Sequence, residues 1–85
     1  MDEELIGKVV KYFAKPGVAA VEMTAGVLRL GDSIHIKGHT TDLEDTVRSM
    51  EVEKQSIEEA QSGSLIGIKV KDRVREGDDV FKIVS

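Results

Sequence analysis

The 85-residue chain contains no cysteine, and its apolar runs are only a few residues long. Without cysteine, neither disulfides nor thiolate metal sites can support the fold. Short apolar runs exclude a membrane-spanning helix, which needs about 20 apolar residues. Residues 1–4 are acidic and no apolar segment follows them, a pattern unlike a secretory signal. We therefore expect a cytoplasmic protein without a membrane partner.

The length of the chain limits it to one small hydrophobic core. Division into two domains would leave each half too little apolar surface to bury. We therefore assign residues 1–85 to a single domain. Within it, we expect residues 1–4 to be a flexible N-terminus.

The net charge of the chain is −4, and the charges are unevenly spread. Residues 38–62 hold seven acidic residues and two basic ones, whereas residues 63–85 hold five basic and four acidic residues. This overall charge argues against a general nucleic-acid binder, which clusters Lys and Arg against phosphates. A local basic patch stays open. Four basic residues alternate along a predicted strand and its following loop, and they form either a solvated face or a patch facing RNA: Lys69, Lys71, Arg73 and Arg75.

Short apolar stretches between turn signals predict an all-β chain. Ile34 and Ile36, for example, alternate with polar residues, which is the period of a half-buried strand. Gly31-Asp32 and Gly77-Asp78 are turn signals, because glycine adopts backbone angles that other residues avoid and aspartate holds the turn. The predicted strands are residues 5–13, 18–23, 33–37, 43–53, 65–70 and 79–84. Six short strands without a convincing helix predict a small antiparallel β-barrel.

Two segments are ambiguous in this pattern. Val47 and Met50 are three residues apart, so residues 43–53 form either a bulged strand or a helical turn; Thr46 and Val47 favour the bulged strand. Residues 54–64 tolerate a helix, but Gly63 arrives too soon for one of ordinary length. We predict a loop there, anchored by Ile57.

The apolar positions of the predicted strands define an expected core. Replacing a central member such as Ile68 with alanine is expected to cost about 2–4 kcal/mol. The expected members are Ile6 or Val9, Phe13, Val18, Val21, Leu30, Ile34, Ile36, Val47, Ile57, Ile66, Ile68, Val70 and Val80.

Six stretches stand out for their order and spacing along the chain. They are Tyr12-Phe13, Val18-Ala19-Ala20-Val21-Glu22, residues 30–42, Val47-Arg48-Ser49-Met50, Glu59-Ala60 and residues 66–70. Together they resemble domain 2 of translational GTPases, the barrel of elongation factor Tu and its relatives. The resemblance covers about residues 5–84. It is strongest to small standalone translation-elongation-factor-like proteins, and related barrels also end some U32-peptidase-like proteins involved in RNA modification.

This resemblance implies a six-stranded antiparallel Greek-key β-barrel. It further implies a non-catalytic module that docks on RNA, meaning tRNA or the ribosome, or on a protein of translation or RNA modification. The alternative is a protein interaction or assembly domain without RNA contact, which the acidic middle of the chain favours. An open strand edge, for instance beside residues 65–70, would also allow a homodimer.

Catalytic and cofactor motifs are not found. The chain has no Gly-x-x-x-x-Gly-Lys-Ser/Thr phosphate loop, so we expect no GTP hydrolysis. It also has no Gly-x-Ser-x-Gly, and we expect neither an enzyme nor a cofactor. His35 and His39, with Asp42 or Glu44, have the residue types of a metal site. Since one histidine lies on a strand and the other beyond a glycine, their directions need not converge, and we predict no metal.

The polar loop at residues 38–42 is the second candidate contact surface. Loops of this kind carry recognition on rigid scaffolds. Alternatively, Thr41 and Asp42 bond to neighbouring backbone and only shape the connection to the next strand. The loop residues proposed as contacts for RNA or a partner are His39, Thr40, Thr41 and Asp42.

Overall fold

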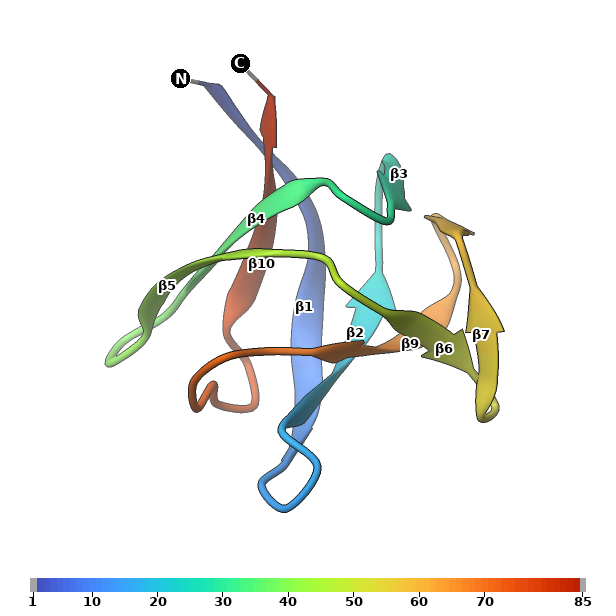
Figure 1. Cartoon of the computed structure of the whole chain (residues 1–85). Coiled ribbons are helices and arrows are strands. Elements are labelled where there is room, and N and C mark those ends of the chain that lie inside the picture. Colours follow the sequence, from blue (N-terminus) through green and yellow to red (C-terminus); the bar gives the residue numbers. More distant parts are fainter. Residues whose placement is uncertain (1, 85) are drawn as a thin grey trace.

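The computed structural model describes residues 2–84, which form ten β-strands (Figure 1). Every strand pairing in it is antiparallel. These residues include no helix of the length and apolarity that crossing a membrane requires. The strands are β1 (Asp2–Phe13), β2 (Val18–Met23), β3 (Val27–Arg29), β4 (Ser33–Lys37), β5 (Asp42–Thr46), β6 (Met50–Val52), β7 (Gln55–Ile57), β8 (Glu59–Gln61), β9 (Leu65–Lys69) and β10 (Asp79–Val84).

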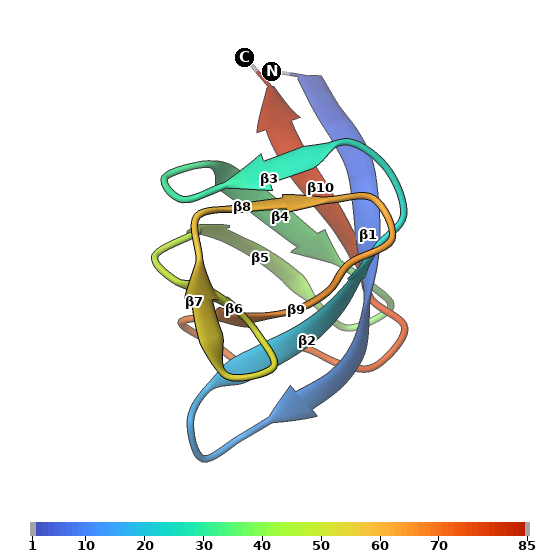
Figure 2. The same ribbon diagram turned by 90° about the vertical axis from the view of Figure 1, so that its right-hand side faces the viewer.

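Two antiparallel sheets wrap around one core. The larger has the order β5-β4-β10-β1-β2-β9-β6-β7, and the smaller pairs β3 with β8. Figure 2 shows the β3–β8 pair beside the β1–β10 pair, across one end of the curled larger sheet. The predicted all-β antiparallel barrel is confirmed. The strands outnumber the predicted six because residues 27–29 and 54–64 contribute short strands and residues 43–53 contribute two.

The division of residues 43–53 corrects the expected bulged strand. Val47 lies between β5 and β6 and donates its backbone N–H to the Asp32 carbonyl, 2.9 Å away. Its own carbonyl accepts the Gly31 N–H, also at 2.9 Å. Because Val47 pairs with the first Gly-Asp turn, the chain leaves β4 there and continues beside β9.

The predicted loop at residues 54–64 is also wrong. Met50–Val52 and Gln55–Ile57 form a tight hairpin, and β8 then pairs with β3. The hairpin turn places Glu53 at φ 51° and Lys54 at φ 67°, a backbone region in which glycine or asparagine is usual. Since neither residue is typical of such a turn, the hairpin had no local sequence signal.

Residues 2–4, expected to be a flexible N-terminus, are part of β1. Asp2 pairs with Val84, Glu3 with Ile83 and Glu4 with Lys82. The described ends of the chain therefore lie side by side, as Figure 1 shows.

The core consists of sixteen buried apolar side chains. They are Ile6, Val9, Ala19, Val21, Met23, Leu28, Ile34, Ile36, Val47, Met50, Ala60, Ile66, Ile68, Val70, Val74 and Val80. Phe13 and Leu30 were wrongly assigned to it, being 44% and 42% exposed. Phe13 ends β1 and Leu30 occupies a turn, so neither side chain continues the inward alternation of a strand. Val18 and Ile57 are half-buried.

The strand edge beside β9 is not open as expected. β9 pairs with β2 over residues 65–69 and with β6 at Gly67 and Ile68. The outer strands of the larger sheet are β5 and β7.

Candidate binding surfaces

One hollow joins two segments that the sequence singled out separately. The connection from β4 to β5 and the connection from β9 to β10 line this hollow, whose volume is about 300 Å³. We call it the polar hollow. It is lined by Thr40, Thr41, Asp42, Leu43, Asp72, Arg73 and Arg75. Five of the eight proposed contact residues therefore share one surface.

The second Gly-Asp turn holds both sides of the polar hollow. The Asp78 carboxylate accepts the Arg75 backbone N–H at 2.8 Å. The same carboxylate lies against Gly38, where a Cβ atom would collide with it. Gly38 in turn donates its N–H to the Thr41 carbonyl at 2.8 Å. The Gly38–Thr41 bond and the Asp78 carboxylate thus constrain the backbone of the loop at residues 38–42, whereas the Asp42 carboxylate bonds to the His35 side chain.

The first Gly-Asp turn has the same geometry. Asp32 accepts the Arg29 N–H at 2.8 Å and returns its own N–H to the Arg29 carbonyl at 3.1 Å. Asp78 and Arg75 make the same pair of bonds at the same lengths. Gly31 and Gly77 have φ values of 91° and 93°, which favour glycine. The repeated Arg-x-Gly-Asp sequence therefore builds one turn type twice.

His35 links the polar hollow to the first strand. Its Nε2 bonds to the Asp42 carboxylate, and its Nδ1 lies 2.7 Å from Glu3 Oε2. The hydrogen bonds with Asp42 and Glu3 raise the pKa of His35, although burial of the ring opposes this. His39 is exposed in the loop. Within residues 2–84, no three His, Asp or Glu side chains are grouped as metal ligands.

Asp45 fixes the start of the β9–β10 connection. One carboxylate oxygen accepts the Lys71 N–H at 2.9 Å, and the other accepts the Thr46 N–H at 2.8 Å and Arg48 Nη1 at 2.7 Å. Burial alone would raise the pKa of Asp45, but the bonds from Lys71, Thr46 and Arg48 outweigh it and lower the pKa. This anchor was not predicted, because its bond to Lys71 joins residues 26 apart in the sequence.

The four basic candidates do not all line the same hollow. Arg73 and Arg75 line the polar hollow, whereas Lys71 lines a second hollow with Glu44 and Asp45. Lys69 lies in β9 opposite Val18 and lines neither hollow. Within residues 2–84, none of the four forms an ion pair with a carboxylate.

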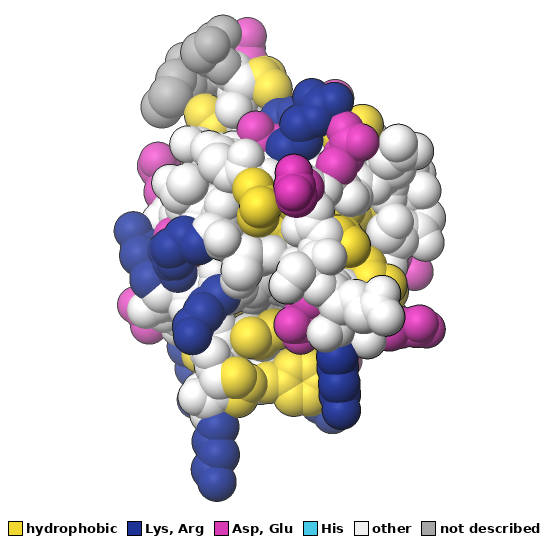
Figure 3. Space-filling view, turned by 45° about the vertical axis from the view of Figure 1, so that its right-hand side comes forward, with side chains coloured by type: hydrophobic (Ala, Val, Ile, Leu, Met, Phe, Trp, Pro, Cys, Tyr) yellow, Lys and Arg dark blue, Asp and Glu magenta, His cyan; other side chains and the backbone are white. Residues whose placement is uncertain are grey.

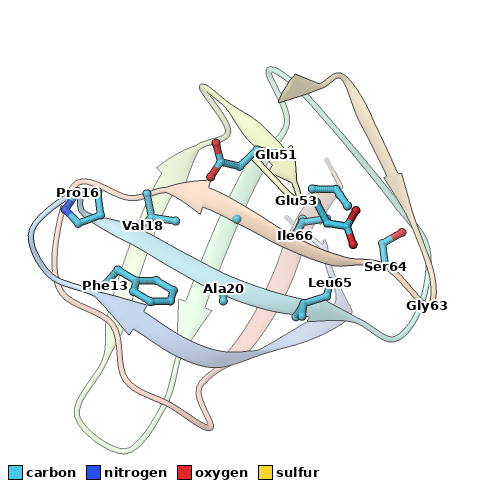
Figure 4. Close-up of a pocket in the computed structure, with 12 residues that line it drawn as sticks. Phe13, Pro16, Val18, Ala20, Glu51, Glu53, Gly63, Ser64, Leu65 and Ile66 are labelled. Carbon is cyan, nitrogen blue, oxygen red and sulfur yellow. The ribbon is translucent and has the colours of Figure 1, made fainter. Parts of the chain in front are cut away.

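A larger apolar groove lies along β2 and β9. Its volume is about 740 Å³. Figure 4 shows Phe13 and Pro16 near the β1–β2 turn, Leu65 on β9, and Glu51 with Glu53 on the β6 side. We call it the apolar groove. The lining residues are Phe13, Pro16, Val18, Ala20, Glu51, Val52, Glu53, Gly63, Ser64, Leu65, Ile66 and Gly67.

The apolar groove is visible on the molecular surface. In Figure 3, hydrophobic side chains gather in the lower half of the molecule, with Lys or Arg side chains on both sides. Lys11 lies next to the groove, with its Nζ 5.2 Å from the centre of the Phe13 ring. This surface was not predicted, because the strand pattern assigned Phe13 to the core.

Comparison with known sequences identifies relatives that are much longer than this chain. It is 40% identical over 78 residues to a collagenase of Porphyromonas gingivalis, covering 91% of this chain and 22% of that protein. It is also 40% identical over 77 residues to an uncharacterised protease of Methanocaldococcus jannaschii, covering 89% of this chain and 19% of that protein. The chain therefore spans about a fifth of the curated relatives that it matches. No protein-family model matches it.

Comparison with solved structures supports the fold. The C-terminal domain of a Geobacillus thermoleovorans protein, provisionally assigned as a U32 peptidase, superposes with a TM-score of 0.87 at 20% identity. That alignment covers 95% of this chain and 93% of the domain. GDP-bound aIF5B of Aeropyrum pernix, a translational GTPase, aligns with a TM-score of 0.68 at 21% identity, over 98% of this chain and 14% of that protein. The resemblance to translational GTPases is thus confirmed for the fold, while the U32 peptidase domain is more similar.

Proposed function

We propose that this chain is a non-catalytic binding module that docks on RNA, meaning tRNA or the ribosome, or on a protein of translation or RNA modification. The observation that carries the proposal is the polar hollow, where loop residues 40–42 meet Arg73 and Arg75. The resemblance of the chain to small translation-elongation-factor-like proteins supports the same function. We propose the cytoplasm as the location of the protein.

The polar hollow has the groups that bind a phosphate backbone. Arg73 and Arg75 are exposed, and their guanidinium groups have no carboxylate partner within residues 2–84. Guanidinium binds phosphate oxygens in a bidentate geometry, and a threonine hydroxyl adds a donor. Asp42 and Asp72 lie in the same hollow and reduce its positive charge. We therefore expect weak binding through few phosphates.

The proposal includes no catalysis by this chain. The relatives with peptidase names extend far beyond the segment that matches it. Within that segment, both nitrogens of His35 are bonded to carboxylates, so His35 has no free nitrogen to activate a serine hydroxyl. We infer that the module serves binding and that any peptidase activity of those relatives resides elsewhere in their chains.

Salt-dependent binding of labelled tRNA tests the RNA proposal. Two or three phosphate contacts predict that log affinity falls with log salt at a slope of about −2. Arg73→Glu with Arg75→Glu should weaken binding about tenfold or more. Arg73→Glu alone should weaken binding less than the double change. Its control, Lys54→Glu, makes the same charge change in the turn between β6 and β7 and should leave binding unchanged. An affinity that changes neither with salt concentration nor with the arginine substitutions would refute RNA docking.

A second candidate function is protein docking without RNA, which the apolar groove favours. Exposed apolar patches of this kind mark interaction surfaces. Homodimerisation remains a further proposal; it would use the outer edge of β5 or β7.

A further inference from the structure

We propose that the apolar groove binds an extended peptide segment of another protein, with an apolar side chain between Phe13 and Leu65 and a lysine or arginine beside Glu51 and Glu53. This site is separate from the polar hollow and does not depend on RNA binding. The two surfaces share no lining residue.

The apolar side chains of the groove are unusually open to solvent. Phe13 is 44% exposed and Leu65 is 58% exposed, although both extend from strands of the sheet. Covering apolar surface is favourable by about 25 cal/mol per Å². The groove volume of about 740 Å³ is within the range of known ligand sites. An apolar side chain with its flanking backbone is therefore a suitable occupant.

Small residues form the floor of the groove. Ala20 and Gly67 face each other across the β2–β9 pairing. A Cβ atom at Gly67 would lie 3.3 Å from Val18 Cγ1 and 3.4 Å from Glu51 Cγ, so these two side chains flank Gly67 closely. The apolar Val18 and the acidic Glu51 therefore lie on either side of one glycine.

The two glutamates on the β6 side of the groove favour a lysine or arginine beside them, whereas Lys11 lies at the opposite side, over the Phe13 ring. Glu51 and Glu53 are exposed and have no ion-pair partner within residues 2–84. They would repel the phosphates of a nucleic acid and attract lysine or arginine. A second copy would present the same concave surface with the same two glutamates, and two concave surfaces match poorly.

Two fluorescein-labelled peptides test the proposal by fluorescence anisotropy. Both carry a central leucine, flanked by lysines in one peptide and by glutamates in the other. The lysine peptide should bind at least about tenfold more tightly. Glu51→Lys with Glu53→Lys should reverse this preference. The control, Glu58→Lys with Glu76→Lys, makes the same charge change at exposed residues outside the groove. It should leave the preference for the lysine peptide unchanged.

Leu65→Asp separates the groove from general charge attraction. This side chain is largely exposed, so the variant should fold, with a thermal midpoint close to that of the parent, and lose peptide binding. Equal binding of both peptides, or binding that survives Leu65→Asp, would overturn the proposal. The proposal would also be overturned if sedimentation velocity showed concentration-dependent dimerisation that Leu65→Asp abolishes. Arg73→Glu with Arg75→Glu should leave peptide binding intact. This variant therefore distinguishes failure of the peptide proposal from failure of the RNA-docking proposal.

Discussion

The polar hollow and the apolar groove differ in what holds their side chains in place. Around the hollow, the side chains of Asp78, Asp45 and His35 are bonded to backbone or to other side chains. In the groove, Phe13 and Leu65 expose much of their surface to water. The loops around the hollow are therefore fixed by bonded side chains, whereas Phe13 and Leu65 should be replaceable with little loss of stability.

The largest expected difference in stability comes from removing one bonded side chain and one exposed apolar side chain. Asp45→Ala should lower the free energy of unfolding by about 3 kcal/mol, because three donors lose a buried carboxylate partner. Leu65→Ala should cost about 0.5 kcal/mol or less, since that side chain is mostly exposed. Urea unfolding of the two variants measures both values. Equal losses would remove the distinction between the two surfaces.

Two glycines provide a second, smaller contrast. Gly38→Ala forces a Cβ atom into the Asp78 carboxylate, so we expect a loss of about 1–3 kcal/mol. Gly67→Ala brings the new Cβ to 3.3 Å from Val18 Cγ1, which a small side-chain movement relieves. Its cost should be below about 1 kcal/mol. Thermal melts followed by circular dichroism compare them, and a larger loss for Gly67→Ala would contradict the proposed rigidity of the loop.

The pH dependence of stability depends on His35. Its raised pKa means that the bonds to Asp42 and Glu3 contribute fully below the unfolded pKa of about 6.5 and are lost as pH rises through the folded value. Because the Asp42 side chain is 75% exposed, the decrease should be about 0.2–1 kcal/mol. Urea melts at increasing pH should show it, and His35→Gln should remove it. The control His39→Gln should leave the decrease unchanged; stability that rises with pH in this window would disprove the assignment.

The smallest effect is expected at the hairpin turn beside the groove. Lys54 has a φ of 67°, which costs an ordinary residue about 1 kcal/mol. Lys54→Gly should therefore stabilise the fold by up to about 1 kcal/mol in urea unfolding. Lys54→Ala retains a Cβ atom and should give no gain. A loss of stability in the glycine variant would argue against this turn.

Local patterns explain which parts of the fold were predictable. The bounds of Val18–Met23, Ser33–Lys37 and Asp79–Val84 follow from alternating apolar residues and turn signals, and they match the structure. The break at Val47 depends on bonds to Gly31 and Asp32, which no local pattern reveals.

The candidate surfaces were also predictable only where a local pattern marks them. Polar and charged residue types pointed to Thr40–Asp42 and to Arg73 and Arg75, and the structure places these together. Lys69 does not line the polar hollow with them, because alternation along a strand does not show where the following loop turns. The apolar groove was not predicted, because an apolar residue at the end of a strand is assigned to the core when its exposure is not known.

The most direct test is an amide chemical-shift map of the folded chain titrated with tRNA at low salt. RNA docking at the polar hollow predicts shifts in residues 40–43 and 72–75 and little change at Val18, Leu65 and Gly67. Shifts confined to the apolar groove, or no shifts at all, would contradict it.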